Sequence, residues 1–265
     1  MKVVLFCGGE GLRLREHSDG LPKPMTRIGY RPILWHVMRY YAHYGHRDFV
    51  LCLGYRADAI KDYFLHYDEA ISNDFVLTNG NRVEHLRTDI SDWRITFADT
   101  GARTLIGQRL LRVRRHLEGE EMFLATYGDC LTDAPLDEVI DAFRASGRVA
   151  AFLSVRAADY PFHLVEVNDR DAVTAVRDTA DADLRINGGF FVLRREIFDY
   201  IGPGEELVDA PFRRLIAEGQ LLAFRHDGFW APMDTLRDVQ RLEAAVEEGR
   251  PPWAVWLDGG AVPVR

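Results

Sequence analysis

The sequence predicts an α/β protein with a doubly wound sheet, because buried strands and helices alternate along its first third. Residues 2–7 and 49–53 are continuous apolar runs, which are typical of strands covered on both faces. Helical segments at 32–44 and 57–66 follow them, and Pro32 and Gly45 suit the two ends of the first. This order indicates parallel strands joined by helical crossovers.

The rest of the chain extends this sheet and adds antiparallel strands. We expect helices at 108–117 and 136–145, strands at 122–126 and 149–155, and antiparallel strands joining the sheet at 164–167, 172–176 and 190–193. Helices at 211–218 and 236–248 close the chain, and a C-terminal helix and tail occupy 235–265. Strand-like runs at 75–78 and 95–98 break the alternation, so residues 68–100 are interpreted as an insertion or β-arm. The absence of a repeat or linker predicts one domain over 1–265.

Composition and charge argue against several classes of protein. The chain has 33 basic and 41 acidic residues and a net charge of −8, which argues against sequence-independent binding of nucleic acid. Its richest basic run, 109–116, has leucine and valine at helical spacing and is interpreted as a solvated helix face. No apolar run approaches the ~18 residues of a membrane span, and three scattered cysteines suit a reducing compartment. We therefore expect a cytoplasmic protein without a membrane partner.

A glycine loop after the first strand is the strongest functional signal. Gly8, Gly9 and Gly11 let backbone N–H groups approach phosphate oxygens, because glycine has no Cβ. Arg13 adds a fixed fork of donors, and Lys23, between two prolines, adds a point charge on a stiff backbone. The pattern favours a nucleoside triphosphate. An ordinary strand-to-helix turn with a surface arginine and lysine remains the alternative.

Two carboxylates are candidate metal ligands. Asp129 follows strand 122–126, at the carboxyl end where open α/β sheets bind ligands, and Asp234 lies before the last helix. Together they could hold Mg²⁺, which prefers carboxylate and phosphate oxygens. Asp129 could instead be a turn residue, and Asp234 could be an N-cap, although Thr235 with Asp238 also resembles a capping box.

Several motifs, in their order along the chain, resemble those of the nucleotide-sugar pyrophosphorylases, and within this nucleotidyltransferase family most closely those of the glucose-1-phosphate cytidylyltransferases. Besides the glycine loop they are Asp99-Thr-Gly101, Thr126-Tyr-Gly-Asp129, Ile186-Asn-Gly-Gly-Phe-Phe-Val-Leu193, Gly228-Phe-Trp230 and Pro232-Met-Asp-Thr-Leu-Arg-Asp238. The resemblance covers nearly the whole chain. It implies a Rossmann-like mixed sheet and a homo-oligomer, with residues 60–100 as a candidate contact arm.

The resemblance also implies a reaction in which a phosphate oxygen of an acceptor attacks the α-phosphorus of CTP and pyrophosphate leaves in line. It implies catalytic roles for Arg13 and Lys23, and Mg²⁺ binding by Asp129 and Asp234. Asn187 and Gly188 would line the acceptor pocket within 150–234, although an ordinary strand start explains them equally well. The remaining assignments are nucleotide binding by Gly8, Gly9, Gly11, Arg13, Lys23 and Arg109, and acceptor binding by Glu166 and Arg177.

Two departures from the family pattern affect these expectations. Leu12 stands where the family usually has a small hydroxyl residue. Asp178 stands where the family has a lysine that binds the sugar phosphate, which reverses the local charge. Arg177 or Arg185 could replace that lysine; otherwise the acceptor is another sugar, cyclitol or small-metabolite phosphate.

Two other classes of function are weaker alternatives. A dinucleotide-dependent dehydrogenase would need the full G-x-G-x-x-G spacing and an acidic residue after the second strand, and the sequence has neither. An inactive nucleotide-binding regulator would be consistent with Leu12 and Asp178. A purely structural role would not require Arg13, Lys23 and the two carboxylates together.

Overall fold

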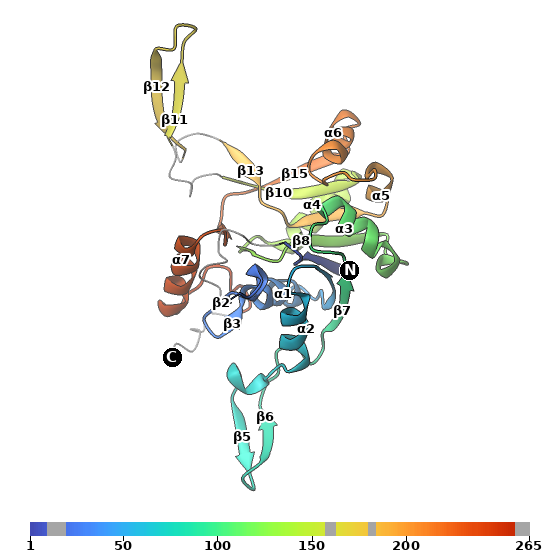
Figure 1. Ribbon diagram of the computed structural model, residues 1–265, viewed down its shortest axis with the longest axis vertical. Coiled ribbons are helices and arrows are strands. Elements are labelled where there is room, and N and C mark those ends of the chain that lie inside the picture. Colours follow the sequence, from blue (N-terminus) through green and yellow to red (C-terminus); the bar gives the residue numbers. More distant parts are fainter. Residues whose placement is uncertain (10–19, 157–162, 180–183, 258–265) are drawn as a thin grey trace.

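An eight-stranded mixed sheet with helices on both faces forms the centre of the computed structural model, which describes residues 1–9, 20–156, 163–179 and 184–257 (Figure 1). The strand order is β13-β10-β14-β8-β1-β4-β7, and β15 pairs with β10. The parallel part consists of β1 (Lys2–Phe6), β4 (Asp48–Leu53), β7 (Arg94–Asp99) and β8 (Met122–Tyr127). The other strands are β10 (Ala150–Arg156), β13 (Arg185–Asn187), β14 (Phe191–Arg194) and β15 (Leu221–His226), with β14 antiparallel to β8. The predicted doubly wound sheet with added antiparallel strands is confirmed.

The central strand β1 is covered on both faces, as its continuous apolar sequence predicts. Val3 and Leu5 belong to one core cluster, which includes residues of α1 (Ile33–His43) and α4 (Leu136–Ser146). Val4 and Phe6 belong to the other, which includes residues of α3 (Ile106–Val113), α5 (Ile197–Tyr200) and α6 (Ala210–Ala217). Since neighbouring residues of a strand point to opposite faces, both faces require apolar side chains.

The C-terminal extension is part of the core. Helix α7 (Leu236–Glu247) contributes Leu242 and Val246 to the first core cluster. Trp253 is only 1% exposed, and its indole N–H lies 3.3 Å from Nδ1 of His36 on α1. The extension therefore fixes α7, and with it the segment before α7, against the rest of the molecule.

Two expectations about the strands are wrong. The segments predicted at 164–167 and 172–176 do not join the sheet: β11 (His163–Val167) and β12 (Val173–Asp178) pair with each other in a hairpin that projects from it (Figure 1). The segment predicted at 95–98 is not part of the arm, because it forms the edge strand β7. The arm itself is the hairpin of β5 (Phe75–Thr78) and β6 (Arg82–His85), which lies at the opposite end of the molecule from the β11–β12 hairpin (Figure 1). In the sequence it follows α2 (Ala57–Leu65) and a short 3₁₀ helix, η3 (Glu69–Ile71). A strand pattern predicts pairing but does not name the partner.

The homo-oligomer remains a prediction. Apolar side chains on the β5–β6 hairpin are exposed, among them Phe75, Leu77 and Val83. None of the helices in the described part of the chain is both long and apolar enough to cross a membrane.

Candidate active site

Lys23 lies between the two predicted metal ligands. Its Nζ is 2.6 Å from Oδ2 of Asp129 and 2.5 Å from Oδ1 of Asp234. The side chain of Lys23 is only 14% exposed, whereas those of Asp129 and Asp234 are 23% and 39% exposed. Three predicted site residues from distant parts of the sequence therefore meet in one partly buried cluster, which we call the Lys23 cluster.

The backbone of Lys23 is restrained by the two prolines beside it. Lys23 begins the 3₁₀ helix η2 (Lys23–Met25), with Pro24 in its first turn. The N–H of Met25 donates to the carbonyl of Pro22, and the N–H of Thr26 donates to the carbonyl of Lys23. Because proline fixes φ, the lysine is held with little backbone freedom, as the sequence predicts.

A small sheet brings the two aspartates together. Asp129 follows β8 and precedes β9 (Cys130–Thr132), which pairs antiparallel with β16 (Trp230–Pro232). Beyond this pairing, the N–H of Met233 donates to the carbonyl of Asp129 at 2.9 Å. The next residue is Asp234, so its position follows directly from the register of the two strands.

The alternative that Asp234 is an N-cap does not hold. Thr235 is the N-cap of α7, and its side chain accepts a hydrogen bond from the N–H of Asp238. The carboxylate of Asp238 in turn accepts from the N–H groups of Asp234 and Thr235. The capping box leaves the carboxylate of Asp234 available to Lys23.

Lys23 is positively charged at neutral pH. Burial by itself lowers the pKa of Lys23, but the charges and hydrogen bonds of Asp129 and Asp234 outweigh it and raise the pKa to about 12. An ammonium group of this kind neutralises negative charge and cannot serve as a general base.

The glycine loop and Lys23 line a common cleft. Gly8, Gly9, Lys23, Arg109 and Asp129 all line it. Residues 102–106 and Glu206 line it as well. Among the described residues, the N–H groups of Gly8 and Gly9 have no hydrogen-bond acceptor. The cleft therefore presents backbone donors and an ammonium group together, which is the chemistry of a phosphate site. Gly11 and Arg13 lie outside the described residues, as does Leu12.

The basic run 109–116 predicted that Arg109 lies on a solvated helix face, and this prediction is wrong. Arg109 is 2% exposed, and its guanidinium donates to Oγ1 of Thr100 and to the carbonyls of Leu53 and Ala102. Burial lowers the pKa of Arg109 below its ordinary value. Arg112, Arg114 and Arg115 are exposed as expected. The buried Thr100 gave no sequence signal of its own, apart from its place in Asp99-Thr-Gly101.

Gly8 makes room for this arginine. A Cβ on Gly8 would lie 1.9 Å from Nη1 of Arg109, whereas a Cβ on Gly9 would meet no atom within 4 Å. The two glycines therefore have different roles: Gly8 permits the close approach of Arg109, and Gly9 leaves the cleft open.

Asn187 and Gly188 lie at the end of β13, beside the strand that leads to Asp234. The N–H of Gly188 donates to the carbonyl of Leu153, and its carbonyl accepts from the indole N–H of Trp230 on β16. A Cβ on Gly188 would lie 2.9 Å from Cγ1 of Val155, so the glycine is required by packing within the protein. Their contact with an acceptor remains a prediction.

Glu166 and Arg177 are not brought to the Lys23 cluster. They lie on the projecting β11–β12 hairpin and pair with each other at 3.1 Å, with both side chains more than half exposed. Asp178 lies on the same hairpin, opposite His163. Arg185 is engaged elsewhere, since it donates to the carbonyl of Ser154 and pairs with Asp227 at 2.5 Å. The hairpin's place in the fold explains why local sequence alone could not assign these residues.

The residues of the cluster fit a magnesium ion that is shared with a substrate. Asp129 and Asp234 each place one carboxylate oxygen against Nζ of Lys23, and carboxylate oxygens are the hard donors that Mg²⁺ prefers. Within the described ranges, no group of three or more His, Cys, Asp or Glu side chains forms a complete protein cage for a metal ion. Mg²⁺ commonly takes one or two carboxylates and completes its shell with phosphate and water.

Comparison with known proteins reveals close relatives. No family model matches the chain. The chain is 37% identical over 260 residues to glucose-1-phosphate cytidylyltransferase of Salmonella typhimurium, covering 97% of this chain and all of the relative. It is 36% identical over 258 residues to a protein of Bacillus subtilis named probable glucose-1-phosphate cytidylyltransferase, with the same coverage. Among solved structures, HddC of Yersinia pseudotuberculosis, complexed with GMP-PN, has a TM-score of 0.63 at 18% identity and covers 92% of this chain and 98% of its own.

Proposed function

We propose a specific reaction for this chain, which belongs to the glucose-1-phosphate cytidylyltransferase family of nucleotidyltransferase enzymes: the Mg²⁺-dependent transfer of CMP from CTP to a sugar 1-phosphate, with release of pyrophosphate. The observation that carries the proposal is the Lys23 cluster, in which one ammonium group and two carboxylates meet beside the glycine loop. Glucose 1-phosphate is the acceptor that the relatives' name indicates.

The proposed roles follow from charge and position. The N–H groups of Gly8 and Gly9 bind the phosphate chain of CTP, and Lys23, which lines the same cleft, faces the α-phosphate. As the bond to pyrophosphate breaks, negative charge grows on the phosphate oxygens. A fixed ammonium group stabilises that charge more in the transition state than in the bound substrate.

Arg109, expected from the resemblance to bind the nucleotide, is proposed instead to position the glycine loop. Its guanidinium is held by Thr100 and two carbonyls and lies directly behind Gly8. In this arrangement it fixes the backbone of the loop and adds a positive charge behind the phosphates.

Asp129 and Asp234 are the proposed ligands of Mg²⁺. When bound, this ion neutralises phosphate charge and orients donor and acceptor. The two carboxylates also position Lys23, because each forms an ion pair with its ammonium group.

The acceptor side is the least constrained part of the proposal. Neither Arg177 nor Arg185 replaces the missing phosphate-binding lysine in the described arrangement, because each pairs with a carboxylate. A second candidate function, the same transfer to another phosphorylated acceptor, rests on this observation.

The test is a pyrophosphate-release assay with CTP, Mg²⁺ and a panel of acceptors that includes glucose 1-phosphate, other sugar 1-phosphates and a cyclitol phosphate. We expect turnover with one of them, and its identity decides between the two acceptor classes. Asp178→Lys should improve the use of glucose 1-phosphate if this acid disfavours it; an unchanged rate would assign acceptor choice to other residues. Tight binding of CTP without turnover on any acceptor would contradict the proposed function and favour a regulatory protein.

A further inference from the structure

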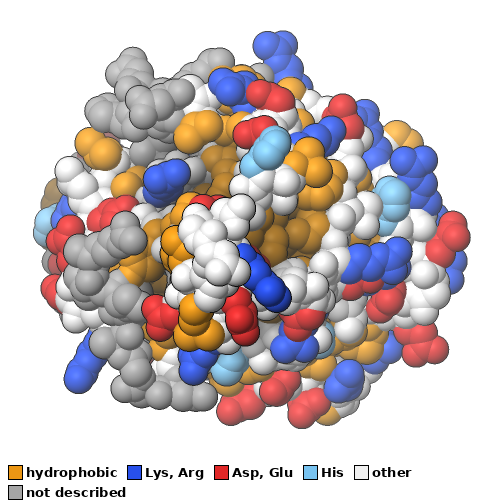
Figure 2. Space-filling model, turned by 90° about the horizontal axis from the view of Figure 1, so that it is seen from below, with side chains coloured by type: hydrophobic (Ala, Val, Ile, Leu, Met, Phe, Trp, Pro, Cys, Tyr) orange, Lys and Arg blue, Asp and Glu red, His pale blue; other side chains and the backbone are white. Residues whose placement is uncertain are grey.

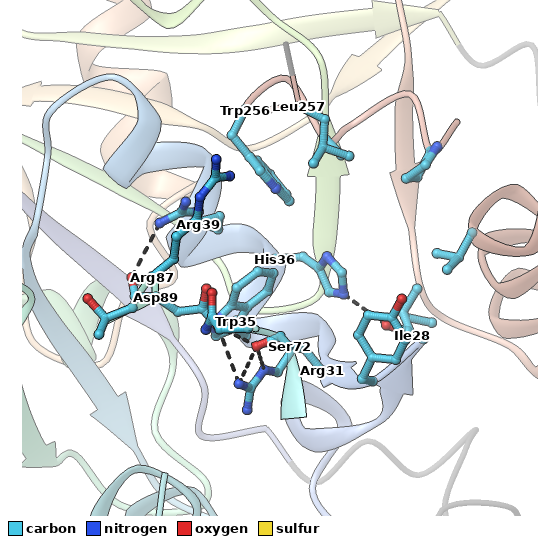
Figure 3. A pocket seen from close by; sticks show the side chains of 17 residues that line it. Ile28, Arg31, Trp35, His36, Arg39, Ser72, Arg87, Asp89, Trp256 and Leu257 are labelled. Carbon is cyan, nitrogen blue, oxygen red and sulfur yellow. Dashed lines mark hydrogen bonds and ion pairs between the residues drawn. The ribbon is translucent and has the colours of Figure 1, made fainter. Parts of the chain in front are cut away.

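A second pocket lies apart from the cleft beside Gly8 and shares no lining residue with it. It is enclosed by α1, the segment before β7 and the segment after α7. Figure 3 shows Trp256 and Leu257 on one side of it and Trp35 and Arg31 on the other, with Arg39 at one end. Seen from below, the molecule has a hollow lined with hydrophobic side chains near the middle of the face (Figure 2).

Two arginines of the pocket have no carboxylate partner among the residues that the structure describes. Arg31 is buried and paired with Asp89, so these two charges cancel. Arg39 donates to the backbone carbonyl of Asp89, and Arg87 is exposed. Neither Arg39 nor Arg87 forms an ion pair within the described ranges. In a chain with a net charge of −8, this local excess of positive charge favours an anion.

The walls of the pocket are partly aromatic. The rings of Trp35 and Trp256 both line it and lie 6.0 Å apart at 88°. They offer apolar surface to a flat ligand. His36 contributes no charge at neutral pH, because burial lowers its pKa to about 4.

We propose that this pocket binds a small anion that combines a planar ring with a phosphate or carboxylate group. The ring lies against Trp35 and Trp256. The guanidinium groups of Arg39 and Arg87 bind the anionic group, for which their planar forks of donors are suited.

The pocket is connected to the Lys23 cluster through two segments of chain. One runs from Lys23 through β2 (Arg27–Ile28) to Gly29, which lines the pocket. The other runs from Asp234 along α7 to Val246, which also lines it. The two segments are joined where the N–H of Gly29 donates to both carboxylate oxygens of Glu243, at 3.2 and 3.1 Å. A ligand in this pocket is therefore expected to change the turnover of the reaction proposed above, and this effect rests on that proposed function.

Calorimetric titration of the full-length protein tests the site. The probes are AMP, which supplies a ring and a phosphate, and indole-3-carboxylate, which supplies a ring and a carboxylate. The titration is carried out without CTP, and the pocket variants below distinguish binding in this pocket from binding in the catalytic cleft. We expect at least one probe to bind once per chain. If AMP is that probe, adenosine and inorganic phosphate should each bind at least about tenfold more weakly than AMP.

Matched variants assign the binding to the pocket. Arg39→Gln and Arg87→Gln should each weaken the bound probe about tenfold, whereas Arg115→Gln, at an exposed arginine outside the pocket, should not. Arg87 is exposed, so its variant is expected to fold even if Arg39→Gln does not. The proposal is overturned if neither probe binds, or if binding is unchanged in Arg87→Gln.

The activity of the same preparation separates the two proposals. Probe binding without any nucleotidyl transfer would retain the pocket and contradict the proposed function. Nucleotidyl transfer without probe binding would support the proposed function and contradict the proposed pocket.

Discussion

The Nζ of Lys23 lies 2.5 Å from Oδ1 of Asp234, although 211 positions separate the two residues in the sequence. The pairing of β9 with β16 places Asp234 beside Asp129, and the capping box makes Thr235, not Asp234, the N-cap of α7. The fold thus concentrates opposite charges where a parallel strand ends, which is the edge at which such sheets bind ligands.

Replacement of Lys23 by alanine should lower turnover far more than affinity for CTP. A charge that acts on the transition state contributes mainly to kcat, so we expect kcat to fall about 10²–10³-fold while the Kd of CTP changes less than about tenfold. Steady-state kinetics and calorimetry measure the two quantities. Lys61→Ala, at an exposed lysine of α2, is the matched control and should be neutral. Equal losses in kcat and affinity for Lys23→Ala would contradict its assigned role.

Replacement of Asp129 or Asp234 by asparagine should abolish Mg²⁺-dependent activity. Each change keeps the size of the side chain but removes a charged ligand and one of the two partners of Lys23. Pyrophosphate release at increasing Mg²⁺ concentration is the measurement, and excess metal should restore little of the rate. Asp137→Asn, on the exposed face of α4, provides the control. A variant with a normal rate at ordinary Mg²⁺ concentration would remove that aspartate from the metal site.

The stability that Lys23 contributes should depend on pH only in the alkaline range. The pKa of Lys23 is raised from its ordinary value of 10.5 to about 12. A raised pKa means that the contribution is fully present below about pH 10.5 and is lost as the pH rises through about 12, with a total of roughly 2 kcal/mol. Urea unfolding of wild type and Lys23→Gln between pH 8 and 12 gives the difference in the free energy of unfolding. A difference that already declines below pH 10 would show that the carboxylates do not hold the ammonium group.

Gly8→Ala and Gly9→Ala should behave differently. The new Cβ at position 8 would displace the guanidinium of Arg109 and its buried hydrogen bonds, at a cost of roughly 1–3 kcal/mol in the free energy of unfolding. The Cβ at position 9 meets no protein atom, so Gly9→Ala should fold normally and instead raise the KM for CTP. Thermal melts and kinetics of the two variants provide the comparison. If both variants had wild-type stability, the proposed support of the loop by Arg109 would be wrong.

Local sequence patterns predicted where strands and candidate site residues occur, but they did not predict which other parts of the chain these contact. The apolar run of β1 correctly indicated a strand buried on both faces, and the two prolines correctly indicated a restrained Lys23. Arg109 appeared to be one of several surface arginines, because helical spacing does not reveal that the loop at Gly8 would cover it. Glu166 and Arg177 were assigned to the acceptor side through the family resemblance, which does not reveal that their strands leave the sheet. The valines of these strands, such as Val165 and Val176, pair with each other in a hairpin and remain exposed.

The most direct test is the kcat of a double-mutant cycle at Lys23 and Asp234. If the two side chains act as one charged unit, Lys23→Ala, Asp234→Ala and the double variant should have nearly the same kcat, each at least about 10²-fold below wild type. Independent losses that multiply in the double variant, or a single variant with normal turnover, would contradict the assignment of the Lys23 cluster as the reaction centre.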